Sequence, residues 1–334
     1  MTTAREIRLK SRPSGFPSRD NFEFATMELG LPGPGEVQVR NLWMSVDPYM
    51  RGRMNDAKSY IAPFELGKAL EGGAVGEVVA SNAEGLQVGD LVTSMLGWRD
   101  LYNAPAGAVR KLQHLPGLPP QAHLGVAGMP GLTAYTGLTR IAGLKEGDIV
   151  FVSGAAGAVG SLACQIAKAK GHKVIGSAGG AAKVAYLKEI GCDAAIDYQA
   201  EPDLTAALAR AAPRGIDVYF DNVGGAHLEA ALAAARLFGR FALCGAISTY
   251  NPTRPSPGVR NLMFAVGKQL RLQGFIVFNH YDLMPEFQQA LSGWVTEGKV
   301  TWRETVVEGL DRAPDAFLGL FQGENLGKML VRLG

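Results

Sequence analysis

The sequence has little of what several classes of protein require. Cysteine occurs only three times, at Cys164, Cys192 and Cys244, and no cysteine or histidine pair has metal-ligand spacing. This pattern argues against a disulfide framework and against a structural zinc site, and it favours buried cysteines in a reducing cytoplasm. No apolar run reaches the roughly 18 residues that a membrane span needs, so none is expected.

An excess of positive charge is also missing. Thirty-three basic and 31 acidic residues give a formal net charge of +2, and the basic residues form no run. This distribution predicts no nucleic-acid partner. The charged segment Met1–Lys10 is not followed by an apolar stretch, so we expect no secretory signal and a cytoplasmic location.

Two catalytic motifs are absent as well. None of the five histidines belongs to an H-E-x-x-H motif, and no G-x-S-x-G elbow occurs. A catalytic zinc needs about three protein ligands, and no such set can be assembled. We therefore expect no metal site, and serine hydrolase chemistry is disfavoured.

The pattern of apolar runs changes along the 334 residues. Residues 36–40, 73–80 and 90–94 are short apolar runs bounded by glycine and proline turns, which predict a β-rich domain. From Asp148 onward, apolar strands alternate with helical segments, and this predicts a parallel sheet with helices on both faces. The expected strands are 149–153, 173–176, 194–196, 216–220, 240–244 and 271–277; the expected helices are 158–170, one ending near 190, 202–212 and 226–236.

Two further features follow the strand series. Pro252, Pro255 and Pro257 mark a loop between the last two strands, because proline lacks a backbone donor and blocks helix continuation. The tail contains strand-like runs at 305–307 and 328–332, and the pattern leaves open whether they return to complete the first domain.

A glycine-rich loop joins the first strand of this series to its helix. The loop Gly154-Ala-Ala-Gly-Ala-Val-Gly160 would let the backbone approach a pyrophosphate at Gly157 and let helix pack on strand at Gly160. Its first motif position is Ala155 rather than glycine, but the strand before it and the helix after it are in place. The loop predicts a dinucleotide site; the alternative is a merely structural turn.

The residues after the second strand bear on the choice of dinucleotide. An NAD site places an acidic residue there, and residues 149–188 contain none, whereas Lys183 follows closely. A lysine pairs with a 2′-phosphate that a carboxylate would repel, so NADP is favoured. Spacing alone leaves open that Lys183 is an ordinary solvated lysine at a helix start.

Tyrosine is the candidate catalytic residue. Without a metal, a nicotinamide enzyme can reduce a carbon–carbon double bond conjugated to a carbonyl, and a neutral hydroxyl can stabilise the resulting enolate. Tyr49, Tyr60 and Tyr250 are flanked by polar or turn residues, and a tyrosine stays protonated at neutral pH. Each could instead be a partly buried tyrosine with a satisfied hydroxyl.

Segments along nearly the whole chain carry a resemblance. They are Val46-Asp-Pro-Tyr-Met-Arg51, Met129-Pro-Gly-Leu-Thr-Ala-Tyr135, Ala155-Ala-Gly-Ala-Val-Gly-Ser161, Lys183-Val-Ala-Tyr186, Tyr219-Phe-Asp-Asn-Val-Gly-Gly225, Cys244-Gly-Ala-Ile-Ser-Thr-Tyr-Asn251, Gln273-Gly-Phe-Ile-Val277 and Glu324-Asn-Leu-Gly-Lys328. With them the chain resembles the zinc-independent medium-chain dehydrogenase/reductases. Within these it is similar to the prostaglandin reductase and leukotriene hydroxydehydrogenase group, which includes double-bond and curcumin reductases.

The resemblance implies an α/β protein with two domains. A GroES-like, β-rich catalytic domain would span residues 1–125 and be completed by 300–334, and a Rossmann NADP-binding domain with a doubly wound parallel sheet would span 126–299. The resemblance also implies NADPH as cofactor and a homodimer.

It further implies a set of cofactor-binding residues. These are Gly157, Ala158, Val159 and Gly160 for the pyrophosphate, Lys183 and Tyr198 for the 2′-phosphate end, and Asn222, Cys244, Gly245, Ala246, Ile247, Ser248, Thr249, Tyr250, Phe275, Ile276, Val277 and Asn325 for the rest.

One departure from the family pattern concerns catalysis. Several relatives carry a tyrosine, a proposed enolate stabiliser, where this chain has Gly267. Another tyrosine would then stabilise the enolate, or water and the ribose hydroxyl of the nicotinamide would do so. The curcumin-reductase type resembles this chain in retaining tyrosines at positions 60 and 250, so Tyr250 and Tyr60 are the first candidates and Tyr49 the weaker one.

The predicted activity is NADPH-dependent reduction of the C=C bond of α,β-unsaturated ketones or aldehydes. Two alternatives stay open: a quinone or carbonyl oxidoreductase on the same fold, and a non-catalytic NADPH-binding sensor or structural protein.

Overall fold

The computed structural model describes residues 1–253 and 258–334, which form two compact units. The first unit comprises residues 1–124, 304–325 and 329–334, and the second comprises residues 125–303 and 326–328. Of the predicted proline loop, Pro255 and Pro257 lie outside the described residues. No described helix is long and apolar enough to cross a membrane.

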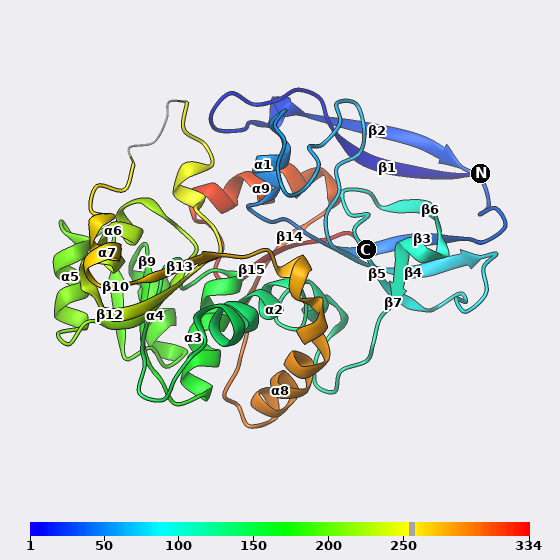
Figure 1. Ribbon diagram of the computed structural model, residues 1–334. Helices are drawn as coiled ribbons and strands as arrows, with labels where there is room; N and C mark the ends of the chain where they lie inside the picture. Colours follow the sequence, from blue (N-terminus) through cyan, green and yellow to red (C-terminus); the bar gives the residue numbers. More distant parts are fainter. Residues whose placement is uncertain (254–257) are drawn as a thin grey trace. The chain divides into compact units, whose positions relative to one another are not determined.

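The first unit is rich in strands (Figure 1). A two-stranded antiparallel sheet pairs β1 with β2, and a larger sheet has the order β14-β15-β3-β4-β5-β7, with β6 also paired to β3. Its elements are β1 (Thr2–Leu9), η1 (Arg19–Asn21), β2 (Phe22–Leu29), β3 (Glu36–Ser45), α1 (Met50–Arg53), β4 (Ala74–Ser81), β5 (Leu91–Ser94), β6 (Leu101–Pro105), η2 (Ala106–Ala108), β7 (Val109–Lys111), η3 (Pro120–Leu124), β14 (Glu304–Glu308), η7 (Leu310–Arg312), α9 (Ala313–Gln322) and β15 (Lys328–Arg332).

Aromatic side chains from both chain ends form the core of the first unit. Phe22 and Trp98 stack with ring centroids 5.8 Å apart, and Phe317 of α9 meets both rings edge-on at 6.2 and 6.1 Å. All three rings are buried. Large rings in stacked and edge-on contact contribute beyond their buried area, so this cluster joins α9 to the N-terminal strands.

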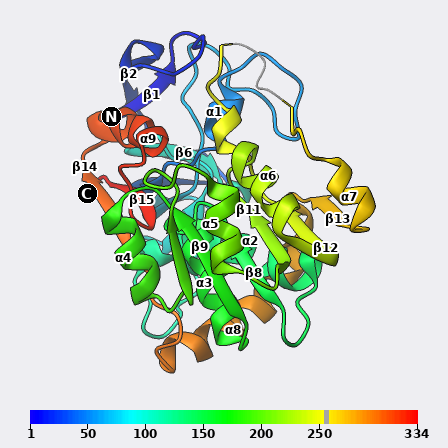
Figure 2. The ribbon, with the colours of Figure 1, turned by 90° about the vertical axis from the view of Figure 1, so that its left-hand side faces the viewer.

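The second unit is built on a six-stranded parallel sheet (Figure 2). Its strands have the order β10-β9-β8-β11-β12-β13, so that the chain runs outward from β8 in one direction and then returns to continue in the other. This is the doubly wound Rossmann topology, in which ligands bind at the carboxyl ends of the strands where the order reverses, here between β8 and β11.

The elements of the second unit alternate along the chain. They are α2 (Met129–Thr136), η4 (Gly137–Ala142), β8 (Ile149–Val152), α3 (Ala158–Ala169), β9 (Lys173–Ala178), α4 (Ala181–Glu189), β10 (Ala194–Asp197), α5 (Leu204–Ala211), β11 (Ile216–Asp221), α6 (Gly225–Ala234), β12 (Ala235–Leu243), η5 (Ile247–Thr249), α7 (Met263–Gly267), β13 (Arg271–Gly274), η6 (Val277–Leu283) and α8 (Met284–Thr296).

Helices cover both faces of this sheet. One face buries Phe151, Tyr219 and Phe241 against α5 and α6. The alternate residues, such as Val150 and Phe220, are also fully buried, and α3 and η4 contact the strands that carry them. A strand buried on both faces is apolar throughout, which is why residues 149–152 form a continuous apolar run.

The predicted α/β class and doubly wound sheet are confirmed, with corrections at element ends. The strand predicted over 240–244 is β12, which begins at Ala235 and ends at Leu243. The last predicted strand, 271–277, ends at Gly274, and Val277 begins the helical turn η6. The helix predicted over 226–236 ends at Ala234, because residues 235 and 236 already pair in β12.

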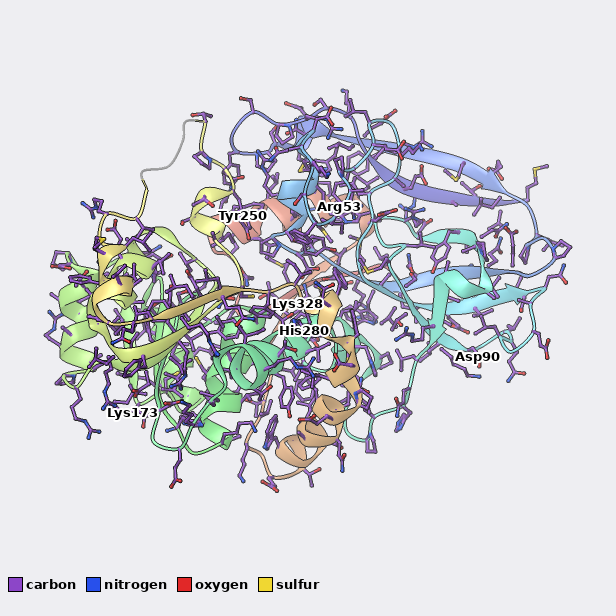
Figure 3. The ribbon with its side chains drawn as sticks, viewed as in Figure 1. Arg53, Asp90, Lys173, Tyr250, His280 and Lys328 are labelled. Atoms are coloured by element: carbon purple, nitrogen blue, oxygen red, sulfur yellow. The ribbon has the colours of Figure 1, made fainter. Side chains whose placement is uncertain are left out.

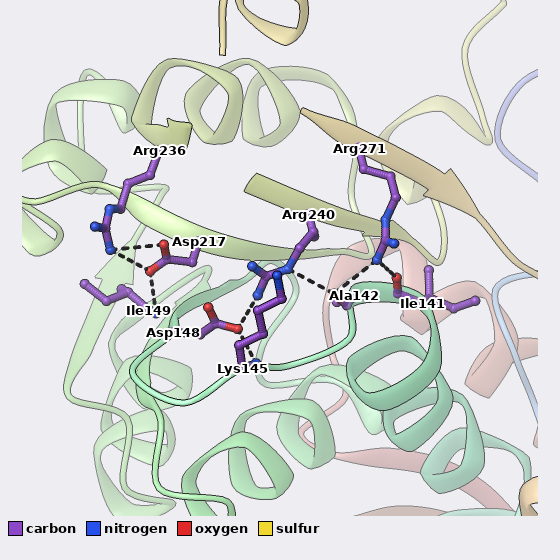
Figure 4. Close-up of polar contacts among 9 residues, drawn as sticks. All are labelled: Ile141, Ala142, Lys145, Asp148, Ile149, Asp217, Arg236, Arg240 and Arg271. Carbon is purple, nitrogen blue, oxygen red and sulfur yellow. Dashed lines mark hydrogen bonds and ion pairs between the residues drawn. The ribbon is translucent and has the colours of Figure 1, made fainter. Parts of the chain in front are cut away.

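Charged side chains bind backbone groups at the other ends of the strands (Figure 4). Arg240 pairs with Asp148 and donates from Nε to the Ala142 carbonyl oxygen at 3.0 Å, and Arg271 donates to the Ile141 and Ala142 carbonyls. These bonds satisfy carbonyl groups at the end of η4 that have no partner within the helix. The side chains of Arg240 and Asp148 are only 13% and 7% exposed, so the pair is nearly buried.

Arg240→Met should lower the free energy of unfolding by about 3 kcal/mol, because it leaves the buried Asp148 carboxylate without its partner. Arg236→Met is the matched control: it removes an ion pair with Asp217 in which the arginine is 51% exposed, and it should change the free energy by less than about 1 kcal/mol. Urea unfolding followed by circular dichroism measures both. Equal losses of unfolding free energy in the two variants would contradict the conclusion that burial makes the Arg240–Asp148 pair the more important one.

Candidate functional site

The glycine-rich loop lies at the carboxyl end of β8, where the strand order reverses. Gly154 has a φ of +58°, a conformation that favours glycine, and Gly157 is the N-cap of α3. A Cβ at Gly160 would lie 2.2 Å from the Gly154 carbonyl oxygen. Only glycine allows this close packing, which brings the first turn of α3 against the loop.

The N-terminus of α3 is open to an anion. Within the described residues no side chain caps it. The first turn of a helix carries N–H groups without helical partners and the positive end of the helix dipole, and these bind phosphate. The predicted pyrophosphate residues Gly157, Ala158, Val159 and Gly160 form this cap and first turn, so the loop fits a dinucleotide.

The C-terminal segment supports the same loop, which the sequence analysis did not predict. Gly327 donates from its backbone N–H to the Ala156 carbonyl oxygen at 2.8 Å and forms a bridge with Gly157. Gly327 has a φ of +71°, and a Cβ there would lie 2.0 Å from the Arg303 carbonyl oxygen. The glycine in the Glu324–Lys328 motif was the available signal for this contact.

Lys183 and Tyr198 lie at the two sides of the turn after β9. Lys183 is the third residue of α4, whose N-cap Gly180 has a φ of +89°, and burial lowers the pKa of its half-buried amine. A Cβ at Gly179 would lie 2.9 Å from the Tyr198 hydroxyl, so this hydroxyl lies against the same turn. The structure therefore brings the two residues predicted for the 2′-phosphate to one turn.

A carboxylate also reaches this turn, although residues 149–188 contain none. Asp197 Oδ1, at the end of β10, accepts from the backbone N–H of Gly180 at 2.9 Å and of Gln199 at 3.1 Å. The hydrogen bond from Gly180 is the main cause that lowers the pKa of Asp197. Asp197 was not predicted for this turn, because only the strand β9 and the helix after it were considered. The neighbouring parallel strand β10 ends at the same edge of the sheet and brings Asp197 there.

Asn222 directly follows β11, next to the glycine-rich loop. Its side chain Nδ2 donates to the Ser153 carbonyl oxygen at 2.7 Å, and its backbone N–H donates to Ser153 Oγ at 3.0 Å. These bonds join the carboxyl ends of β8 and β11 where the strand order reverses.

Tyr250 follows the short helix η5, in the loop that continues from β12 (Figure 3). Its hydroxyl oxygen is 3.4 Å from the backbone N–H of Ala246, which donates to it. The predicted segment 244–250 thus folds back on itself and places the hydroxyl near Gly245. Burial is the main cause that raises the pKa of Tyr250, so the hydroxyl stays protonated at neutral pH.

Cys244 begins this segment and is half-buried. Burial, with a contribution from the charge of Asp221, raises the pKa of its thiol to about 12. The thiol is therefore neutral at physiological pH.

Phe275, Ile276 and Val277 follow β13. The Phe275 ring meets Phe220 edge-on with centroids 6.3 Å apart, and Val277 is buried. The same ring lies close to Gly137, where a Cβ would be 3.0 Å from its Cζ.

Tyr49 and Tyr60 belong to the first unit, as does Asn325. The Tyr49 hydroxyl is buried, and burial and the charge of Asp47 are the leading causes that raise its pKa. The Tyr60 hydroxyl is close enough to contribute to the same rise, so these two tyrosines are neighbours. The Tyr60 side chain is 58% exposed.

Arg53 holds the segment that carries Tyr60 (Figure 3). Its Nε donates to the Ala62 carbonyl oxygen at 2.9 Å, its guanidinium lies 4.0 Å from the centroid of Phe64, and it pairs with Glu71 at 2.7 Å. Sequence reasoning did not single out Arg53.

No steric constraint requires glycine at position 267, where the family pattern has a tyrosine in several relatives. Gly267 ends α7, it is exposed, and a Cβ there would meet open space. The backbone would thus accept a larger residue at this position. Within residues 1–253 and 258–334, no group of three or more histidine, cysteine, aspartate or glutamate side chains could hold a metal ion.

Two sequence families match the chain. One, described as "N-terminal domain of oxidoreductase", matches residues 5–112, and one described as "Zinc-binding dehydrogenase" matches residues 158–294. Among the relatives, 2-alkenal reductase (NADP(+)-dependent) of Nicotiana tabacum is 42% identical to this chain. Its alignment spans 98% of this chain and 96% of the tobacco protein.

Prostaglandin reductase 1 of Rattus norvegicus is also 42% identical, over 99% of this chain and 100% of its own length. The crystal structure of CurA in complex with NADPH, from Vibrio vulnificus, superimposes with a TM-score of 0.93 at 42% identity and covers 99% of both chains. The chain therefore belongs to the prostaglandin reductase and alkenal reductase group of the medium-chain dehydrogenase/reductase family, and the resemblance predicted from the sequence is confirmed.

Lys183→Ala should weaken NADPH binding by about 10- to 100-fold and change NADH binding little, because one charge-assisted bond to a phosphate contributes about 1.5–3 kcal/mol. Lys188→Ala, which removes the same charge from an exposed position on α4, is the matched control and should leave both affinities unchanged. Fluorescence titration with each cofactor measures the four affinities. Equal losses of NADPH and NADH in Lys183→Ala would show that this lysine does not meet the 2′-phosphate.

Proposed function

We propose that this protein uses NADPH to reduce the C=C bond of α,β-unsaturated ketones or aldehydes. The observation that carries the proposal is the uncapped, glycine-packed N-terminus of α3 at the reversal of strand order, with Lys183 and Tyr198 at the neighbouring turn. The names of the relatives, a 2-alkenal reductase and a prostaglandin reductase, and the NADPH in the CurA structure support the same chemistry.

In this proposal the second unit holds the cofactor along the carboxyl ends of its strands. Residues Gly157–Gly160 bind the pyrophosphate, and Lys183 and Tyr198 bind the 2′-phosphate. Asn222, residues 244–250 and 275–277, and Asn325 line the remaining length of the cofactor. The first unit is then the GroES-like catalytic domain.

Bound NADPH would supply a hydride to the β-carbon of the substrate. The negative charge then collects on the carbonyl oxygen, where a neutral hydroxyl donor stabilises it. A proton from a hydroxyl group or from water adds at the α-carbon and completes the saturated product. Tyr250 is the favoured donor because its hydroxyl has a raised pKa and is held by the Ala246 N–H. Tyr60 and Tyr49 are the alternatives, and the burial of the Tyr49 hydroxyl makes it the weaker one.

Protein mixed with NADPH and an enone or enal should consume NADPH, seen as a loss of absorbance, and release the saturated carbonyl compound. Tyr250→Phe should lower kcat by about 100-fold, since positioned proton donors contribute about 10²–10⁴-fold. An alcohol or hydroquinone product would establish the carbonyl or quinone oxidoreductase instead. Tight NADPH binding without turnover across a broad panel would indicate a non-catalytic protein.

We further propose that the protein is a cytoplasmic homodimer. Strand β13 lies at one edge of the six-stranded sheet, where unpaired backbone groups can accept another strand. Exposed apolar side chains lie on β12, which pairs with β13, and on or beside α7, which precedes β13 in the chain. Exposed apolar surface of this kind marks association sites. These side chains are Leu237, Phe238, Leu262, Met263, Phe264 and Val266. The three cysteines are free, as is usual in a reducing compartment.

Light scattering after size-exclusion chromatography should give twice the 35.4 kDa chain mass for the wild type. Val266→Glu should shift the protein to the monomer, because it places a charge on this exposed apolar surface. Leu31→Glu, at an 85% exposed position of the first unit, should leave the dimer intact. A monomeric wild type, or an unchanged dimer in Val266→Glu, would contradict this interface.

A further inference from the structure

A buried carboxylate lies beneath the turn that follows β11. Asp221 is only 2% exposed, and a single oxygen, Oδ1, is within hydrogen-bond distance of four donors. The Tyr219 hydroxyl donates at 2.7 Å, the backbone N–H groups of Gly224 and Val223 donate at 2.8 and 2.9 Å, and Ser153 Oγ lies at 3.2 Å. Tyr219 is fully buried and its hydroxyl also lies 3.0 Å from Ser153 Oγ.

These bonds fix the turn formed by residues 222–224. Two of its N–H groups bind the carboxylate, and the third, that of Asn222, binds Ser153 Oγ at 3.0 Å. Gly224 completes the turn with a φ of +72°. Every backbone donor of the turn is thereby held by one buried side-chain network that spans the ends of β8 and β11.

The turn in its place holds the loop that carries Tyr250. Cys244 and Gly245 donate from their backbone N–H groups to the Asp221 carbonyl at 2.9 and 3.0 Å. Ile247 donates to the Asn222 carbonyl at 3.2 Å, and Ser248 donates to the Val223 carbonyl from N–H at 3.2 Å and from Oγ at 2.6 Å. The carbonyls of residues 221–223 thus bind four residues of the loop, which are Cys244, Gly245, Ile247 and Ser248.

Burial of the Asp221 carboxylate opposes its charged form, and the hydrogen bonds of the network offset part of that effect. Burial is the main cause that raises the pKa of Asp221, so the folded protein holds the proton more tightly than the unfolded chain does. The contribution of such a group to stability falls as the pH rises from the ordinary carboxyl pKa to the raised one, and the charged form then weakens the fold. Four donors converge on one oxygen of this buried side chain, and two of them are backbone N–H groups of the turn, which indicates a role in fixing that turn.

We propose that Asp221, held by Tyr219 and Ser153, is a positioning residue that fixes the Asn222–Gly224 turn and, through it, the loop carrying Tyr250. This inference rests on the proposed function, because it assigns the network to the placement of groups that contact NADPH and the carbonyl oxygen. Asp221 acts through the turn.

Tyr219→Phe tests the proposal by removing one donor from Asp221 and Ser153. Moving the turn should raise both the Kd and the KM for NADPH about tenfold and should lower kcat at saturating NADPH. A variant that is merely less stable has fewer active molecules, which lowers the apparent kcat and leaves the KM for NADPH unchanged. The split between KM and kcat therefore separates positioning from stability.

Tyr102→Phe is the matched control. Tyr102 is a buried tyrosine of β6, in the first unit, and its hydroxyl donates to Ser94 Oγ at 3.0 Å. The variant loses the same kind of bond and should lower the melting temperature by a similar amount. Its Kd and KM for NADPH should equal those of the wild type.

Two substitutions of Asp221 test whether an oxygen acceptor at this position is sufficient to keep NADPH binding. Asp221→Asn retains an oxygen acceptor at Oδ1 and should keep the Kd for NADPH within about threefold of the wild type, because the donors keep a partner. Asp221→Ala removes the acceptor and should raise the Kd at least as much as Tyr219→Phe does. Should Asp221→Ala fail to fold, Tyr219→Phe and Asp221→Asn still decide the question.

Different measurements distinguish a failure of the proposed NADPH-dependent function from a failure of the positioning role of Asp221. A wild-type protein that binds no NADPH would overturn the proposed function, and the positioning role would fall with it. A wild type that binds and oxidises NADPH, next to a Tyr219→Phe variant with unchanged Kd and KM, would overturn only the positioning role.

Discussion

The close packing of α3 against the glycine-rich loop is the constraint on which the candidate cofactor site depends. A Cβ at Gly160 would stand 2.2 Å from the Gly154 carbonyl oxygen, closer than any two such atoms can approach. Because the helix can come this near, its first-turn N–H groups lie at the carboxyl end of β8. The absence of a Cβ at Gly160 permits this packing. The packing in turn places the positive end of the helix dipole at the edge of the sheet where an anion would bind.

Near this contact, two acidic side chains of the second unit bind backbone N–H groups of the turns beside them. Lys183 is the cation at the turn after β9, and Asp197 is engaged by two backbone N–H groups there. On the other side of β8, the Asp221 carboxylate is surrounded by donors and holds a turn. The two acids thus bind the protein's own backbone, and Lys183 supplies a positive charge at the turn after β9.

Local sequence patterns predicted the parts of the fold that depend on local physics. The apolar run 149–152, the glycine spacing at 154–160 and the alternation of strands with helices all follow from residues near one another in the chain, and the sheet is found as predicted. The resemblance to known reductases, which rests on motifs along the whole chain, predicted the family correctly. The roles of the individual site residues remain proposals.

What the sequence did not predict depends on contacts between distant segments. The approach of Asp197 to the turn after β9 requires two strands to end at one edge, and the bond from Gly327 to Ala156 joins residues far apart in the chain. The end of β13 at Gly274 was also missed, because apolar residues continue to Val277 and periodicity cannot distinguish a strand from the helical turn that follows. The pairing of β1 with β2 was missed too, since neither strand is a continuous apolar run: β1 carries Arg5, Glu6 and Arg8, and β2 carries Glu23 and Glu28.

The bond between Gly327 and Ala156 has a consequence for biosynthesis. Domains generally fold as units while the ribosome is still adding residues, but residues 326–328 of the second unit are made after every strand of its sheet. The sheet of that unit can assemble earlier, whereas its glycine-rich loop lacks this backbone bond until residue 327 has been added. A ribosome stalled shortly before residue 327 would hold a nascent chain with a formed sheet and an unsupported nucleotide loop.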